Sequence, residues 1–228
     1  MIINQTYGFT FIHIPKSAGT SVTQFLAPLN GPFDLEIGGT AFGEEIQSAY
    51  TRRHKLRKHS TLSEAQGAIK TARASGEMFT FTFVRNPYDR LSSAFSFLRR
   101  WEEYNPELLK IMKGFSSFQE FIASGIYAKI PGPDGMFRNQ CEWLKINGEV
   151  PNQMYCFRIE DAEEAIQEIK YKLERRGADI SLLGTTLPHK NSSQSQRIED
   201  IELSSKQRSL IVDHYAEDFR SFGYVPLK

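Results

Sequence analysis

The chain has 228 residues, 40% of them hydrophobic and 12% aromatic, so it can bury one substantial core but is short for two full domains. Lys and Arg number 28 against 27 Asp and Glu, and this balance excludes a general electrostatic attraction to nucleic acid or to an anionic membrane. We therefore predict one domain over residues 1–228 and expect no nucleic-acid partner.

The cysteines and the N-terminal apolar run bear on the location of the protein. Cys141 and Cys156 have no metal-ligand spacing and are too few for a disulfide framework, which favours a reducing compartment. The apolar run at residues 9–14 is interrupted by His13 and stopped by Pro15, so it is too short for a signal sequence or a membrane span. We expect a cytoplasmic protein without a membrane anchor.

Strands and helices alternate among the elements that the sequence predicts. Apolar runs predict buried strands at residues 9–14, 78–84 and 153–159. Periodicity and end signals predict helices at residues 20–26, 61–74, 162–176 and 204–222. Thr61 and Glu64 form a capping box, and Asn86 is a good N-cap with Pro87 at the first helical position. This order predicts an α/β fold with a largely parallel central sheet flanked by helices.

The first chemical signal is the segment IPKSAGTS, which lies between the first predicted strand and the helix at residues 20–26. The start of a helix presents unpaired N–H groups and a positive dipole end to an anion. Lys16 adds a positive charge, and Gly19 permits close approach of the backbone. The predicted phosphate-binding residues are Lys16, Ser17, Ala18, Gly19, Thr20 and Ser21. The alternative is a polar turn that carries a solvated lysine.

The second signal is the segment FVRNPYDRLSS, again at a strand end that enters a helix. A magnesium-dependent phosphotransferase would place an acidic residue there, whereas this strand ends in Arg85. Arg85 suits bidentate phosphate binding, and Ser93 could add a hydroxyl two turns into the helix. The alternative is that Arg85 pairs with a carboxylate such as Asp89. Two separate anion sites imply a ligand with two separated anionic groups.

Together, FIHIPKSAGTS and FVRNPYDRLSSAF resemble the two nucleotide-binding motifs of the carbohydrate-type sulfotransferases, the family that groups heparan sulfate 2-O-sulfotransferase with bacterial homologues. The segments at residues 157–160, 187–192 and 215–224 resemble later blocks of that family in the same order, so the resemblance covers nearly the whole chain. It implies a P-loop-like parallel sheet and the donor 3′-phosphoadenosine 5′-phosphosulfate. The loop from Lys16 to Ser21 would hold the 5′-phosphosulfate, and Arg85 with Ser93 would hold the 3′-phosphate.

Three further residues fall on blocks of the resemblance. Arg90 occupies a motif position, but it could equally pair with Asp89 or Glu102 on the surface or with another element. Asn191 and Ser192 either line the nucleotide pocket or cap a loop. Their roles are left open by the sequence.

The implied reaction is an in-line sulfuryl transfer to an acceptor hydroxyl, with negative charge developing on the leaving oxygen. Lys16 is the group placed to stabilise that charge. The sequence holds no convincing metal-ligand set, and we expect no metal cofactor.

A histidine is the side chain best suited to remove the acceptor proton near neutral pH. The five histidines are His13, His54, His59, His189 and His214. We predict His59 as the base, because it lies where the chain enters a capped helix. The resemblance also places a histidine between the two nucleotide motifs, and His54 is the alternative residue to align with it. His13 is expected in a core or loop-orienting role, and His214 in a structural or exposed one. The alternative for His59 is that it merely flanks the helix.

The acceptor is not identified by the sequence. The basic segment at residues 52–58 would attract an acidic glycan, although it equally fits a solvated basic face. Aromatic residues at 101–104 either stack on a sugar or pack on the core. The competing functions are a P-loop-type nucleotide or small-molecule kinase, which would bind ATP with magnesium, and a non-catalytic nucleotide-binding module. The sequence does not determine the oligomeric state.

Overall fold

The computed structural model describes residues 1–72, 77–100, 106–188 and 201–227. The chain forms two compact units, each built from two stretches of sequence. The first unit comprises residues 1–84 and 140–190, and the second comprises residues 85–139 and 191–228. Within the described part of the chain, no helix combines the length and the apolar character needed to cross a membrane.

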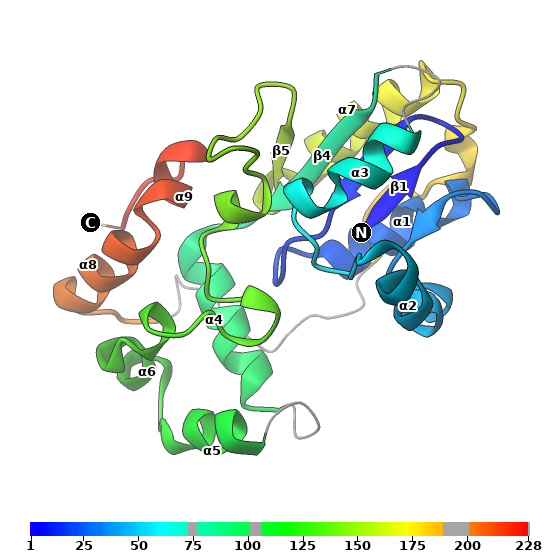
Figure 1. Ribbon diagram of the computed structural model, residues 1–228. Helices are drawn as coiled ribbons and strands as arrows, with labels where there is room; N and C mark the ends of the chain where they lie inside the picture. Colours follow the sequence, from blue (N-terminus) through cyan, green and yellow to red (C-terminus); the bar gives the residue numbers. More distant parts are fainter. Residues whose placement is uncertain (73–76, 101–105, 189–200, 228) are drawn as a thin grey trace. The chain divides into compact units, whose positions relative to one another are not determined.

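The first unit is built on a five-stranded sheet with the order β3-β1-β2-β4-β5 (Figure 1). Its strands are β1 (Ile2–Asn4), β2 (Phe9–Ile12), β3 (Leu35–Glu36), β4 (Phe79–Val84) and β5 (Tyr155–Arg158). β4 pairs in parallel with β2 and with β5, whereas β1 pairs antiparallel with β2 and β3. Ile12 lies opposite Thr82 in the parallel pair, so β2 and β4 end at the same edge of the sheet.

The two faces of the sheet differ in chemistry because side chains alternate along a strand. The phenylalanines of β2 and β4 share one face, where Phe79 and Phe81 stack with ring centroids 4.8 Å apart. That face packs against α1 (Gly19–Leu26) and α7 (Ala162–Glu174) through a continuous apolar core. α3 (Leu62–Ala72) lies on the other face, near Thr80. The sheet is therefore flanked by helices on both faces.

The remaining long helix of the first unit is α2 (Ala41–His54), which begins at a Thr40 cap and ends at Lys55 in a left-handed conformation (φ 58°). Of its 14 residues only Gly43 is buried. α2 therefore contributes little to the core and presents most of its side chains to solvent.

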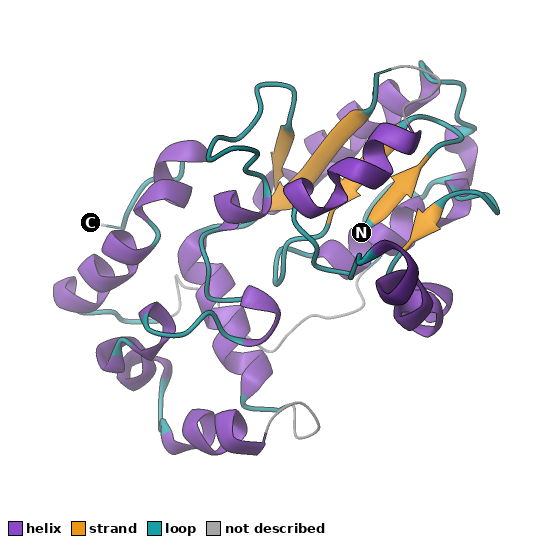
Figure 2. Ribbon diagram, in the orientation of Figure 1, coloured by secondary structure: helices purple, strands orange, loops and turns teal. Residues whose placement is uncertain are grey.

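The described residues of the second unit form helices and no strand (Figure 2). Its helices are α4 (Pro87–Leu98), α5 (Pro106–Gly114), α6 (Phe118–Ser124), α8 (Ser205–His214) and α9 (Ala216–Ser221). Buried aromatic rings form its core, with Phe95 stacked on Phe121 at 5.0 Å and Phe121 in contact with Phe137 and Tyr127.

The predicted fold class is confirmed, since the chain is an α/β protein with a largely parallel central sheet flanked by helices. The antiparallel strands β1 and β3 were not among the predicted elements. The single helix predicted at residues 204–222 is wrong, because the chain leaves helical geometry at Tyr215 (φ −103°, ψ 22°) and continues as α9. Two hydrogen bonds accompany this break: the Tyr215 hydroxyl and Nε2 of His214 both donate to the Phe137 carbonyl, at 3.0 and 2.9 Å.

Candidate functional site

The predicted phosphate loop connects β2 to α1 in a tight turn. Lys16 and Ala18 both adopt left-handed backbone conformations, with φ of 67° and 58°. Such values are uncommon for residues that carry a Cβ and often mark turns or functional sites. The turn brings the chain into α1, which begins at Gly19 directly after Ala18.

The start of α1 leaves backbone donors open. The first bond of the helix runs from the Val22 N–H to the Ala18 carbonyl at 3.1 Å, and alanine has no side-chain oxygen that could cap the turn before it. Within the described ranges, the N–H groups of Gly19, Thr20 and Ser21 therefore meet no acceptor. Other helices satisfy one such donor with a capping side chain from Thr40, Asn86, Ser117 or Ser204. α1, like α7, begins without a capping side chain, and open N–H groups at the start of a helix suit an anion.

The Ser17 hydroxyl is engaged within the protein. It donates to Oε1 of Gln140 at 2.9 Å, and both residues are buried. This bond joins the loop to the stretch that begins at residue 140. The sequence predicted that this hydroxyl donates a hydrogen bond to phosphate. In the structure, the hydroxyl donates to Gln140.

Gly19 has a structural reason to lack a side chain. A Cβ built on Gly19 would lie 2.0 Å from Cδ2 and 2.2 Å from Nε2 of His13. The position that a Cβ would take at residue 19 is therefore occupied by the His13 imidazole.

His59 lies beside the strand end that leads into the loop. Its Nδ1 is 2.8 Å from the His13 carbonyl oxygen, and its ring meets the His13 ring edge-on with centroids 4.6 Å apart. A carbonyl can only accept a hydrogen bond, so Nδ1 carries the proton and Nε2 is left as an acceptor. Trp143 fixes the backbone of the same residue, because its indole N–H donates to the His59 carbonyl at 3.1 Å.

The electrostatics of this pair favour neutral imidazoles. Burial lowers the pKa of His59 from 6.5 to about 3, although the hydrogen bond to the His13 carbonyl raises it. Burial also lowers the pKa of His13 well below its ordinary value, and the charges of Lys58 and Lys16 act in the same direction. The environment of the pair is thus electropositive, which favours an anionic ligand.

The basic segment divides into paired and solvent-exposed cations. Lys58 forms an ion pair with Glu44 at 2.7 Å, and its aliphatic stem covers Gly38. Arg52 and Arg53 lie in the last turn of α2, where a positive charge stabilises the helix dipole. The exposed members of the segment are Arg52, Arg53, His54, Lys55 and Arg57.

The second predicted anion motif belongs to the second unit. Arg85 directly follows the last residue of β4, and the Asn86 side chain caps α4 by accepting from the Tyr88 N–H at 3.1 Å, as predicted. Ser93 is buried within α4. Arg90 is buried too, and its Nη1 donates to the Arg138 carbonyl at 2.8 Å, so it does not lie on the surface.

Several predicted residues lie outside the described ranges. They are Trp101 to Tyr104, His189, Asn191 and Ser192. His54 is exposed at the end of α2. His214 has the structural role given as one expectation, since its Nε2 bonds the Phe137 carbonyl.

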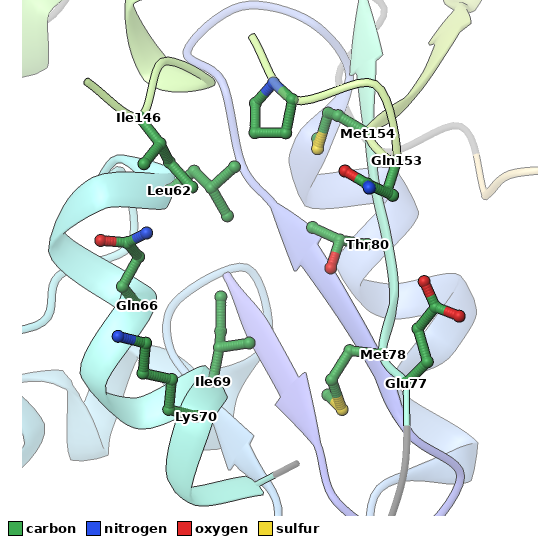
Figure 3. Close-up of a pocket in the computed structure, with 11 residues that line it drawn as sticks. Leu62, Gln66, Ile69, Lys70, Glu77, Met78, Thr80, Ile146, Gln153 and Met154 are labelled. Atoms are coloured by element: carbon green, nitrogen blue, oxygen red, sulfur yellow. The ribbon is translucent and has the colours of Figure 1, made fainter. Parts of the chain in front are cut away.

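A groove of about 250 Å³ lies on the α3 face of the sheet (Figure 3). Side chains of α3 and β4 line it, together with the segment that precedes β5; among them are Leu62, Gln66, Ile69, Lys70, Glu77, Met78, Thr80, Ile146, Gln153 and Met154. No residue of the phosphate loop lines it, and its charged side chains are one lysine and one glutamate. A groove of this composition does not select a multiply charged anion.

The loop, the helix that it enters and the parallel pair β2–β4 define a P-loop-like type of α/β fold. The model of the sulfotransferase family matches residues 1–225, and the chain belongs to this family. The family identifies it as a transferase. Comparisons with curated proteins and with solved structures find no match.

Proposed function

We propose that the protein transfers a sulfuryl group from 3′-phosphoadenosine 5′-phosphosulfate to the hydroxyl of an acceptor. The observation that carries the proposal is the start of α1, where the N–H groups of Gly19, Thr20 and Ser21 meet no acceptor among the described residues and follow Lys16 in the chain. Sulfotransfer requires a binding site for an anionic donor, and these groups supply dipoles and charge suited to its 5′-phosphosulfate.

Lys16 is proposed to act on the leaving group. The bond between sulfur and the bridging phosphate oxygen breaks as the acceptor oxygen bonds to sulfur, and negative charge builds on the nucleotide. A lysine ammonium beside that oxygen stabilises the transition state more than the bound donor. The products are the sulfated acceptor and 3′-phosphoadenosine 5′-phosphate.

Arg85 and Ser93 are proposed to bind the 3′-phosphate. Arg85 follows β4 in the chain, and β4 is the parallel neighbour of the strand that leads into the phosphate loop. An arginine can bind phosphate through two N–H groups at once, which is the recognition that a 3′-phosphate needs.

His59 is proposed to take the proton from the acceptor hydroxyl. Its Nδ1–H is held by the His13 carbonyl, so the unprotonated Nε2 is available as the base. The negative charge of a bound donor would raise the lowered pKa of His59 and so strengthen it as a base. His54 lies exposed at the end of α2 and lacks a comparable hydrogen bond among the described residues.

For the acceptor we propose an acidic glycan. The exposed cations between Arg52 and Arg57 precede His59 in the chain and would attract a polyanion. Lys58 is excluded from this role by its ion pair with Glu44.

Radiolabelled donor tests the proposal most simply. The protein would be incubated with labelled 3′-phosphoadenosine 5′-phosphosulfate and a panel of acidic glycans, neutral glycans, lipids and small alcohols. Wild type and His54→Ala should transfer the label to an acidic glycan. Transfer by Lys16→Ala and by His59→Ala should be strongly reduced. Binding of the nucleotide without transfer to any acceptor would favour a non-catalytic module, and binding of ATP with magnesium would favour a kinase.

A further inference from the structure

The imidazole of His13 packs against two aromatic rings and the start of α1 in the first unit. Its side chain is buried between Phe11, with ring centroids 5.8 Å apart, and His59, at 4.6 Å edge-on. Its Cδ2 and Nε2 lie directly against Gly19, the first residue of α1. One residue therefore contacts both the start of the anion-binding helix and the predicted base.

The contact with His13 explains why residue 19 is a glycine, whereas its backbone geometry does not. The left-handed positions of the loop are occupied by Lys16 and Ala18, which carry side chains, whereas Gly19 does not have a positive φ. An alanine at residue 19 would thus suit the backbone but would place its Cβ 2.0 Å from His13. A buried aromatic ring packed on two sides cannot move aside as a flexible chain end can.

Packing alone does not explain why residue 13 is a histidine. Its Nδ1 is buried and forms no hydrogen bond within the described residues, which costs free energy that a phenylalanine would avoid. The backbone carbonyl of the same residue accepts the Nδ1–H bond that fixes the His59 tautomer.

We propose that His13 is a positioning residue that couples the phosphate loop to His59. Its ring sets the distance between the start of α1 and the His59 imidazole, and its carbonyl orients that imidazole. The proposal rests on the function proposed above for His59.

A double-mutant cycle between residues 13 and 19 tests the coupling. Gly19→Ala should lower the melting temperature and the turnover in the His13 background, and His13→Ala should remove most of that loss because it vacates the space of the new Cβ. Gly67→Ala is the matched control, since Gly67 lies in α3 with nothing within 4 Å of an added Cβ. Equal losses from Gly19→Ala in both backgrounds would show that the glycine serves the ligand and would overturn the proposal. If Gly19→Ala alone fails to fold, recovery of a cooperative melt in the double variant is the supporting result, and failure of both is the refuting one.

A second readout separates positioning from simple packing. His13→Ala should lower turnover by about 10- to 100-fold, as expected for a misplaced catalytic group, while the dissociation constant for 3′-phosphoadenosine 5′-phosphate changes by less than about threefold. The His13→Ala variant keeps the backbone carbonyl that accepts the Nδ1–H bond, so any change at His59 would come from loss of the ring that packs edge-on against it. ¹⁵N NMR of the His59 imidazole should show the Nδ1–H tautomer alone in wild type and both tautomers in the variant, whose His59 ring is no longer held against that carbonyl. An unchanged tautomer would show that the ring of residue 13 does not position His59 and would overturn the proposal. This spectrum and the melting temperatures need no activity, so they remain decisive if the protein transfers no sulfuryl group.

Discussion

The lowered pKa of His59 makes the stability of the fold depend on pH in a defined direction. The pKa falls from 6.5 in the unfolded chain to about 3 in the folded protein, chiefly through burial. Between these values the unfolded state binds the proton and the folded state does not, so stability is lost as the pH falls below 6.5. One pKa unit corresponds to about 1.4 kcal/mol, so the loss attributable to His59 at pH 4.5 is roughly 3 kcal/mol.

Urea unfolding of wild type and His59→Gln at pH 7.0, 5.5 and 4.5 measures this effect. The variant lacks the titrating group, so the free energy of unfolding should fall less steeply with acidification than in wild type, by roughly 3 kcal/mol over the range. His54→Gln, at an exposed position, should follow the wild-type profile. His13 is buried in both proteins and its contribution largely cancels. Parallel profiles for wild type and His59→Gln would refute the assignment of a partly buried, neutral His59.

Three further substitutions test other parts of the structure. Thr61→Ala removes the capping box with Glu64, in which the Glu64 N–H donates to the Thr61 hydroxyl at 3.2 Å. The free energy of unfolding measured in urea should fall by about 1 kcal/mol, and no change would mean that solvent replaces the cap. Ser17→Ala leaves the buried Gln140 without the Ser17 hydroxyl and should cost about 1–3 kcal/mol in the same assay, whereas a neutral effect would contradict a structural role of that bond. Lys16→Ala should lower turnover more than donor affinity, and steady-state kinetics with a loss confined to affinity would contradict its role in the transition state.

Much of the fold follows from local sequence signals. The runs that contain β2, β4 and β5 are apolar, and Thr61 with Glu64 and Asn86 with Pro87 cap helices as their residue types require. The short strands β1 and β3 escape such analysis, because two or three residues carry no periodicity.

The break between α8 and α9 shows the limit of periodicity. Apolar residues repeat at helical spacing through Tyr215, yet hydrogen bonds to a carbonyl 78 residues away accompany the end of α8 there. Tertiary contacts of this kind are not encoded in local spacing.

The candidate site was predictable in its parts but not in its internal contacts. The charge of Lys16 and the lack of a capping side chain on Ala18 can be read from the sequence beside a strand end. The contact between His13 and Gly19, the bond from Ser17 to Gln140 and the bond from Trp143 to His59 join residues up to 123 positions apart, and no local signal announces such pairs.

Calorimetric titration with 3′-phosphoadenosine 5′-phosphate and with adenosine 5′-monophosphate tests the central claim most directly, because the two ligands differ only in the 3′-phosphate. Wild type should bind the bisphosphate much more tightly, and Arg85→Ala should lose roughly 2–4 kcal/mol of that binding while its affinity for the monophosphate is nearly unchanged. Equal affinity of wild type for the two nucleotides would contradict a 3′-phosphate site at Arg85.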